Sequence, residues 1–128
     1  MGNELVLIVE DNEKNRKLAR FILTAKGFRT IEADSAEACL ALLKQETPDL
    51  VLMDISLPGM DGTAALAEMR AIPRTAKIRV VALTAFAMKD DRERFLTAGF
   101  DGYLTKPIDA RTFADQVRSF CEQPVADA

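Results

Sequence analysis

The sequence predicts an α/β domain in which a parallel sheet of five strands is covered by helices on both faces. Short apolar runs alternate along the chain with segments in which apolar residues recur every three to four positions, as expected for strands that alternate with amphipathic helices. Parallel neighbours need crossover connections, which these helices supply. The 128 residues fit one domain, so function must come from one site or one surface.

Four of the five expected strands end at polar residues. Glu10 and Asp11 follow the first apolar run, Asp54 closes the third, Thr84 closes the fourth and Lys106 follows the last. In open parallel sheets the carboxyl ends of the strands meet at one edge, where ligands bind, so we expect these side chains to lie together. The second segment mixes polar and apolar residues, which favours an edge strand. The strands are expected at residues 5–9, 28–33, 50–54, 78–84 and 102–105.

The helices are expected to begin at capping residues. Asn12, Ser35 and Asp109 can each accept a hydrogen bond from the first turn of a helix. Helices are predicted over residues 12–26, 35–46, 63–71 and 88–98, and after residue 109.

Apolar stripes indicate which side of each helix faces the sheet. The charged fourth helix has Phe95 and Leu96 as its main apolar anchors, so we expect few contacts to hold it. The expected stripes are Leu18, Phe21, Ile22 and Ala25 in the first helix, Cys39, Leu40, Leu42 and Leu43 in the second, and Phe113, Val117, Phe120 and Cys121 in the last.

Composition excludes several classes of function. The chain has no histidine, which excludes Ser-His-Asp and Cys-His catalysis and histidine-ligated metals. A net charge of −3 argues against general binding to nucleic acid or anionic membranes. Cys39 and Cys121 are expected to be reduced thiols. No apolar run approaches the roughly 18 residues of a membrane span and no secretory signal is evident, so we expect a cytoplasmic protein.

The expected cluster suits phosphoryl chemistry. Three carboxylates at one rim repel one another unless a cation offsets them. Ligands that are all oxygen atoms indicate Mg2+. Lys106 and the Thr84 hydroxyl can bind anionic oxygens, and an ionised Asp54 beside the metal can attack phosphorus to give an acyl phosphate.

With these residues, the chain resembles the receiver domain of two-component response regulators. The matching positions occur in the family's order and at similar intervals, and within the family residues 9–12 and 83–89 are most similar to the single-domain DivK-type regulators. The resemblance implies a flavodoxin-like (βα)5 three-layer sandwich with strand order 2-1-3-4-5, formed by residues 1–123, and a short tail at 124–128. The matches are Glu10-Asp11, Asp54, Pro58-Gly59, Asp61-Gly62, Thr84-Ala85 and Lys106-Pro107.

The resemblance also implies roles at the metal site. Asp54 would be the phosphoacceptor. Asp11, Asp54 and the backbone carbonyl of Ser56 would bind Mg2+ directly, and Glu10 would act mainly through water.

Further residues are implied to sense the phosphoryl group. Thr84 would donate a hydrogen bond to it and Lys106 would form an ion pair with it, while the Lys106-Pro107 peptide would be cis. Thr84, Tyr103 and Phe86 would form the switch, although Tyr103 could equally be an ordinary half-buried strand aromatic. Phe86 offers no group that orients water, so we expect slow loss of the phosphoryl group.

The implied function is that of a phosphorylation-operated switch. A histidine kinase or histidine phosphotransfer protein would donate the phosphoryl group, and the signal would leave by protein contacts on the fourth helix, last strand and last helix. We expect no enzyme activity beyond the domain's own phosphorylation and dephosphorylation, no nucleic acid or membrane partner, and a monomer or weak dimer.

Two other classes of function compete with this one. A phosphohydrolase with an aspartyl-phosphate intermediate usually needs a second acid two residues after the nucleophile, where this chain has Ser56. A small-molecule module of flavodoxin-like fold would need a phosphate-cradling glycine loop after the first strand, where Glu10 and Asp11 would instead repel an anionic cofactor.

Overall fold

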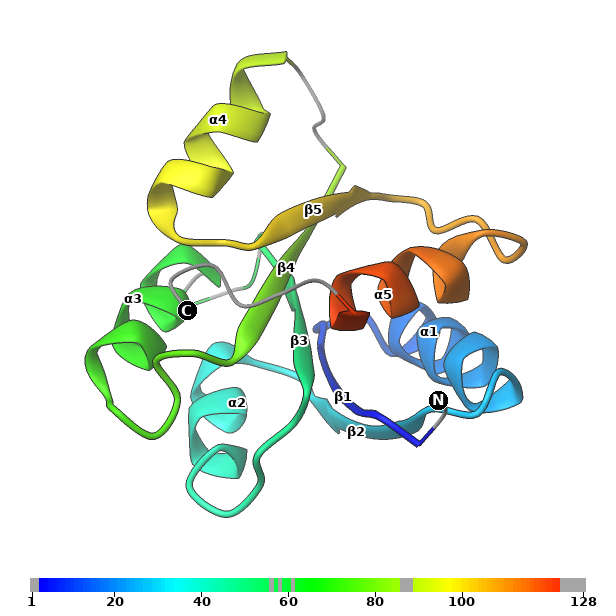
Figure 1. The fold of residues 1–128 in the computed structure, drawn as a ribbon, viewed down its shortest axis with the longest axis horizontal. Helices are drawn as coiled ribbons and strands as arrows, with labels where there is room; N and C mark the ends of the chain where they lie inside the picture. The colour runs from blue at the N-terminus through cyan, green and yellow to red at the C-terminus, as the bar shows by residue number, and fades with distance from the viewer. Residues whose placement is uncertain (1–2, 56, 58, 61, 86–88, 123–128) are drawn as a thin grey trace.

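The computed structural model describes residues 3–55, 57, 59–60, 62–85 and 89–122, without the side chains of 89–92. In these ranges the chain forms one parallel sheet of five strands in the order β2-β1-β3-β4-β5, joined by five helices (Figure 1). The α/β class and the strand order are therefore as predicted. The strands are β1 Leu5–Val9, β2 Arg29–Ala33, β3 Leu50–Asp54, β4 Arg79–Thr84 and β5 Gly102–Thr105. The helices are α1 Glu13–Ala25, α2 Ala36–Leu42, α3 Gly62–Ala71, α4 Lys89–Ala98 and α5 Phe113–Glu122.

The helices form two layers around the sheet (Figure 1). Helices α1 and α5 pack on one face against Val6 and Ile8 of β1, whereas α2, α3 and α4 pack on the other face against Leu7 and Val9. Side chains alternate between the faces of a strand, so a strand covered on both sides must be apolar throughout. This explains why β1 and β3 are buried along their whole length.

Two of the predicted caps are present. The Asn12 side chain accepts a hydrogen bond of 3.0 Å from the Asn15 backbone amide at the start of α1. The Ser35 hydroxyl accepts one of 3.0 Å from the Ala38 amide at the start of α2. Among the described residues, no helix has the length and apolar character needed to cross a membrane.

The predicted inward face of α1 was wrong in part. The buried residues are Ala19, Ile22 and Leu23, so the helix is turned by one position relative to the expected stripe. The small side chain of Ala19 lets the helix lie close to the sheet, and the larger apolar residues one position earlier face solvent. The exposed members of the predicted stripe are Leu18 at 42%, Phe21 at 72%, and Ala25.

Three further details differ from the prediction. Helix α2 ends at Leu42, and the chain continues in hydrogen-bonded turns. Helix α5 begins at Phe113, because the Asp109 side chain accepts from the Arg111 amide and fixes a turn ahead of the helix. In α4, Leu96 is 44% exposed and Phe95 alone of the two predicted anchors is buried.

Both cysteines carry free thiols, as predicted. Burial raises the pKa of the Cys39 thiol to about 12, which fits an inert residue of the core. Cys121 is half-buried at the end of α5. Of the apolar stripe predicted for α5, Phe113 and Val117 are buried.

Candidate functional site

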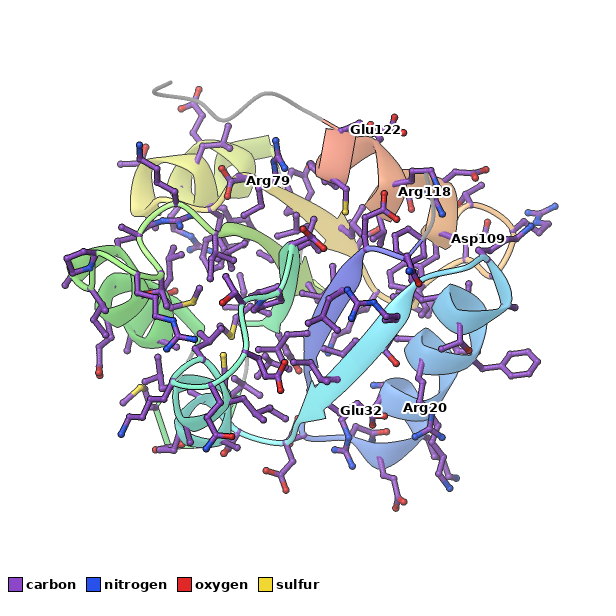
Figure 2. All side chains as sticks on the ribbon, turned by 60° about the horizontal axis from the view of Figure 1, so that its bottom comes forward. Arg20, Glu32, Arg79, Asp109, Arg118 and Glu122 are labelled. Atoms are coloured by element: carbon purple, nitrogen blue, oxygen red, sulfur yellow. The ribbon has the colours of Figure 1, made fainter. Side chains whose placement is uncertain are left out.

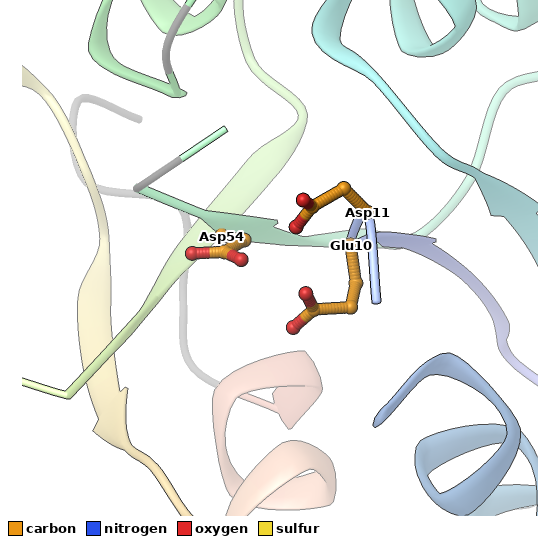
Figure 3. Close-up of side chains that lie close together, drawn as sticks. All are labelled: Glu10, Asp11 and Asp54. Carbon is orange, nitrogen blue, oxygen red and sulfur yellow. The ribbon is translucent and has the colours of Figure 1, made fainter. Parts of the chain in front are cut away.

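Three carboxylates meet at the carboxyl edge of the sheet. Glu10 and Asp11 follow β1, Asp54 ends β3, and one oxygen from each of these side chains lies within 4.8 Å of the others (Figure 3). Glu10 and Asp54 are each 3% exposed, whereas Asp11 is open to solvent. The structure thus brings together the three acids that were predicted to share a site.

Lys106 reaches two of these acids from the end of β5. Its ammonium lies 2.9 Å from Asp54 Oδ2 and 3.0 Å from Glu10 Oε1. Its backbone amide donates to the Thr84 carbonyl at 2.8 Å, and Thr84 is 4% exposed. The Lys106–Pro107 peptide is cis, as the resemblance implies. Residues from four strand ends therefore form one site.

The site holds more negative than positive charge. Lys106 offsets one of the three carboxylate charges and leaves a local charge of about −2 when all three acids are ionised. Burial raises the pKa of the Glu10 carboxyl; the Asn12 amide and Lys106 lower it, and Asp54 raises it. Burial disfavours the Lys106 ammonium, but its bonds to Asp54 and Glu10 outweigh this and raise its pKa.

These residues fit a divalent cation. All the donors are carboxylate oxygens, which suit Mg2+, and two of the acids are buried where charge is costly. The exposure of Asp11 leaves the site open to water and to a substrate. Mg2+ typically keeps several waters and is held by only one or two carboxylates, so this partly open arrangement is suitable.

Arg16 is part of the site, although it was not among the residues predicted from the sequence. Its Nη1 donates to the Glu10 backbone carbonyl at 2.9 Å, and its Nε lies 3.2 Å from Glu32 Oε1 on β2. Arg20, one turn later, pairs with the other Glu32 oxygen at 2.9 Å (Figure 2). Two arginines spaced by four residues share one face of a helix. That spacing was the available signal, but it did not reveal the contact with the end of β1.

Gly62 brings the start of α3 against the end of β3. A Cβ atom at this position would lie 2.6 Å from the Asp54 carbonyl oxygen and 2.9 Å from Met53 Cγ. Since real Cβ atoms do not approach so closely, only glycine fits without displacing the backbone. The backbone of Asp54 is thus packed directly against a helix.

Three further residues were predicted for the metal site or the switch, namely Tyr103, Ser56 and Phe86. Tyr103 is half-buried, and its ring centroid lies 5.9 Å from that of Phe95, which is 3% exposed. The two rings are tilted by 54°, so Tyr103 contacts α4 directly. Ser56 and Phe86, expected at the metal site and in the switch, lie outside the described residues.

An apolar pocket of about 240 Å³ opens beside the acids. Its walls include Leu18 and Ala19 of α1, Leu83 of β4 and Ile108, and its rim includes Lys106. The exposed Leu18 therefore borders the charged site.

The family match and the sequence relatives of this chain agree on one family. Residues 6–118 match the response regulator receiver domain. The polar-differentiation response regulator DivK of Brucella ovis is 41% identical over 115 residues, which cover 90% of this chain and 94% of that protein.

Two solved structures are similar over nearly their whole length. The receiver domain of a sensor histidine kinase from Pseudomonas aeruginosa, with a magnesium ion coordinated in its active site cleft, is 30% identical with a TM-score of 0.85, covering 95% of this chain and 100% of that one. The chemotaxis response regulator CheY4 of Vibrio cholerae has the same fold, with a TM-score of 0.87 at 20% identity, covering 92% and 98% of the two chains.

Proposed function

The chain belongs to the response regulator receiver domain family, and on this basis we propose that it is a single-domain response regulator phosphorylated on Asp54. The phosphoryl group would come from a phosphohistidine of a sensor kinase or of a phosphotransfer protein. The observation that carries the proposal is the setting of Asp54, a buried carboxylate within 4.8 Å of two other acids and 2.9 Å from the Lys106 ammonium.

The chemistry requires a nucleophile and charge neutralisation. An Asp54 carboxylate oxygen attacks phosphorus, and the phosphorus–nitrogen bond breaks with its electron pair going to the imidazole nitrogen of the donor. Lys106 lies close enough to bind the transferred phosphoryl oxygens. The Thr84 hydroxyl is the expected hydrogen-bond donor to the product, since Thr84 ends the strand next to β3.

Mg2+ is the proposed cofactor. Asp11, Asp54 and the Ser56 carbonyl would hold it directly and Glu10 would act through water. When bound, the ion neutralises charge that develops on the transferred group. The Arg16 contact with the Glu10 carbonyl fixes the strand end that carries two of these residues.

The phosphodonor is proposed to dock beside the acids. Leu18 is 42% and Phe21 72% exposed on the outer side of α1, and Leu18 lines the apolar pocket that reaches Lys106. Exposed large apolar side chains next to a reactive site suit contact with a protein donor.

The output surface is proposed to comprise α4, β5 and α5. Thr84 and the ring of Tyr103 would change their contacts on phosphorylation, together with Phe86, and bias the position of α4. Among the α4 side chains that the structure describes, Phe95 is buried, and the Arg70 guanidinium holds the turn after the helix through the Gly99 carbonyl at 3.0 Å. Such sparse anchoring suits a moving element.

The same proposal extends to the substrate, the location and the downstream partner of the protein. The protein would act on no substrate but its own aspartyl phosphate, which it would lose slowly because Phe86 cannot orient water. The free thiols Cys39 and Cys121 support a cytoplasmic location. The downstream partner is proposed to be a protein.

The test is labelling by a small phosphodonor. Incubation with acetyl phosphate and Mg2+ should add one phosphoryl group, which peptide mass spectrometry should map to Asp54. Asp54→Asn should abolish the label. Asp49→Asn, at the other end of β3, is the matched control and should retain it. A label that persists in Asp54→Asn would overturn the assignment.

A further inference from the structure

A groove runs between α2 and α3, away from the acidic site. The two helices lie side by side on one face of the sheet (Figure 1). The groove encloses about 580 Å³, with Leu43 and Thr75 buried at its floor. Its exposed or half-exposed rim consists of Glu37, Leu40 and Lys44 on the α2 side and Glu68, Ile72 and Arg74 on the α3 side.

Along the α2 side of the groove, an acidic side chain is followed by an apolar one and then by a basic one. Glu37 lies in the first turn of α2, Leu40 in its middle, and Lys44 in the turn that follows it. Glu37 and Lys44 are seven residues apart, which corresponds to about 10 Å along a helix. The two charges therefore lie at opposite ends of this wall.

On the α3 side the order along the chain is also acid, apolar, base, but over a shorter distance. Glu68 lies in the last turn of α3, Ile72, which is 46% exposed, follows the helix, and Arg74 lies in the next turn. Both helices run from the carboxyl edge of the sheet to its amino edge, so the two walls have the same direction. Arg74 donates a hydrogen bond to the Lys44 carbonyl, which brings the two basic residues together at one end.

We propose that this groove is a self-association surface that binds a second copy of the chain about a two-fold axis. An axis through the middle of the groove reverses the direction of the partner's walls. Glu37 of each copy then faces Lys44 and Arg74 of the other. The half-buried Leu40 and the exposed Ile72 add apolar area that the interface removes from water.

The charge order is what selects a second copy as the occupant. A surface that is acidic at one end and basic at the other is complementary to itself after a two-fold rotation, so one patch supplies both halves of the interface. The groove lies on the opposite side of the sheet from α1, and the association does not depend on the proposed phosphorylation. The charged pairs would be partly exposed, so we expect weak association, with a dissociation constant on the order of 100 µM at low salt.

The first measurement is the mass of the full chain by sedimentation equilibrium at low ionic strength. Glu37→Lys and Lys44→Glu should each raise the dissociation constant at least about tenfold, because one substitution in a two-fold interface replaces two attractive contacts by two repulsive ones. Raising the salt concentration should weaken association of the unsubstituted chain.

The decisive experiment mixes the two variants. A Glu37→Lys chain and a Lys44→Glu chain, each mostly monomeric alone, should form a heterodimer, because the new lysine of one faces the new glutamate of the other and the native pair remains at the other end. Glu13→Lys and Lys17→Glu provide matched controls, since this exposed pair on α1 is also acidic in the first turn and basic later. Neither control should change the mass, alone or mixed.

Three results would overturn the proposal. The first is a monomer at all concentrations up to about 1 mM at low salt, well above the expected dissociation constant. The second is association that survives Glu37→Lys or Lys44→Glu. The third is a failure of the mixture to recover association while circular dichroism shows both variants folded.

Discussion

The two edges of the sheet use charged residues in different ways. At the amino edge, Arg118 lies 3.2 Å from the Glu4 carboxylate and donates to the Lys26 carbonyl at 3.0 Å. Arg79, labelled with Arg118 in Figure 2, donates to the Cys121 carbonyl at 2.9 Å. These bonds tie the start of β1, the end of α1 and the end of α5 together. At the carboxyl edge, the charged side chains of Glu10, Asp54 and Lys106 contact one another, and Arg16 donates to the Glu10 carbonyl.

The bonding of the charged groups also separates the two edges. The amino edge includes the acids Glu4, Asp49 and Asp101 and the arginines Arg29, Arg79 and Arg118, each of which makes a hydrogen bond or ion pair. At the carboxyl edge, the carboxylates of Glu10 and Asp54 share the ammonium of Lys106, and Asp11 is exposed beside them. An edge whose charges are paired or bonded to the backbone stabilises the domain, whereas a cluster of acids around the Lys106 ammonium favours binding of a cation.

The largest expected effect is on the carboxyl edge. Asp11→Asn removes a proposed metal ligand and should lower the rate of Mg2+-dependent labelling by acetyl phosphate by about 100-fold at a fixed Mg2+ concentration. Glu4→Gln, at the amino edge, should leave that rate unchanged. An unaltered Mg2+ titration of Asp11→Asn would exclude Asp11 as a metal ligand.

At the amino edge the expected effect is on stability. Arg118→Ala removes the contact with Glu4, the bond to Lys26 and the stacking of the guanidinium 4.4 Å above the Phe28 ring. The free energy of unfolding in urea should fall by about 2 kcal/mol. Labelling of the folded variant should be normal; a loss of labelling in folded protein would mean that the two edges are coupled.

Substitution of Asp54 is expected to raise the free energy of unfolding, by less than Arg118→Ala lowers it. Without Mg2+, Asp54→Asn relieves repulsion among the acids and should raise the free energy of unfolding by about 1 kcal/mol. Asp49→Asn weakens the bond to the Leu5 amide and should lower it. If urea denaturation gives both changes the same sign, charge imbalance is not what distinguishes the edges.

The smallest effect is expected for Glu4→Gln. Arg118 keeps its bond to Lys26 and its contact with Phe28 in this variant, and the glutamine oxygen can still accept a hydrogen bond. The free energy of unfolding should fall by about 0.5 kcal/mol. A loss as large as that of Arg118→Ala would show that the ion pair, and not the arginine's other contacts, holds this edge.

The sequence was sufficient to predict the carboxyl edge. A strand buried on both faces is apolar throughout, so the first polar residue after it marks its end without ambiguity. Glu10 and Asp54 were located in this way, and Lys106 follows the short edge strand β5; the parallel arrangement implied that the three side chains meet. The roles proposed for these side chains still depend on the labelling experiment.

The helices were harder to predict because their patterns allow more than one face. In α1, apolar residues form two overlapping stripes that share Ile22. The space between the helix and the sheet selects the stripe that contains Ala19, and Phe21 remains exposed. Arg16 was missed for a related reason. A long side chain can reach several partners, and its bond to the Glu10 carbonyl depends on where α1 lies relative to β1.

Gly62 places the start of α3 directly against the end of β3. A Cβ atom at this position would lie 2.6 Å from the Asp54 carbonyl oxygen, so little space is left for the strand to move toward the helix. If Asp54 is phosphorylated as we propose, we expect the new group to be accommodated on the opposite side of β3, by movement of Thr84 and Lys106.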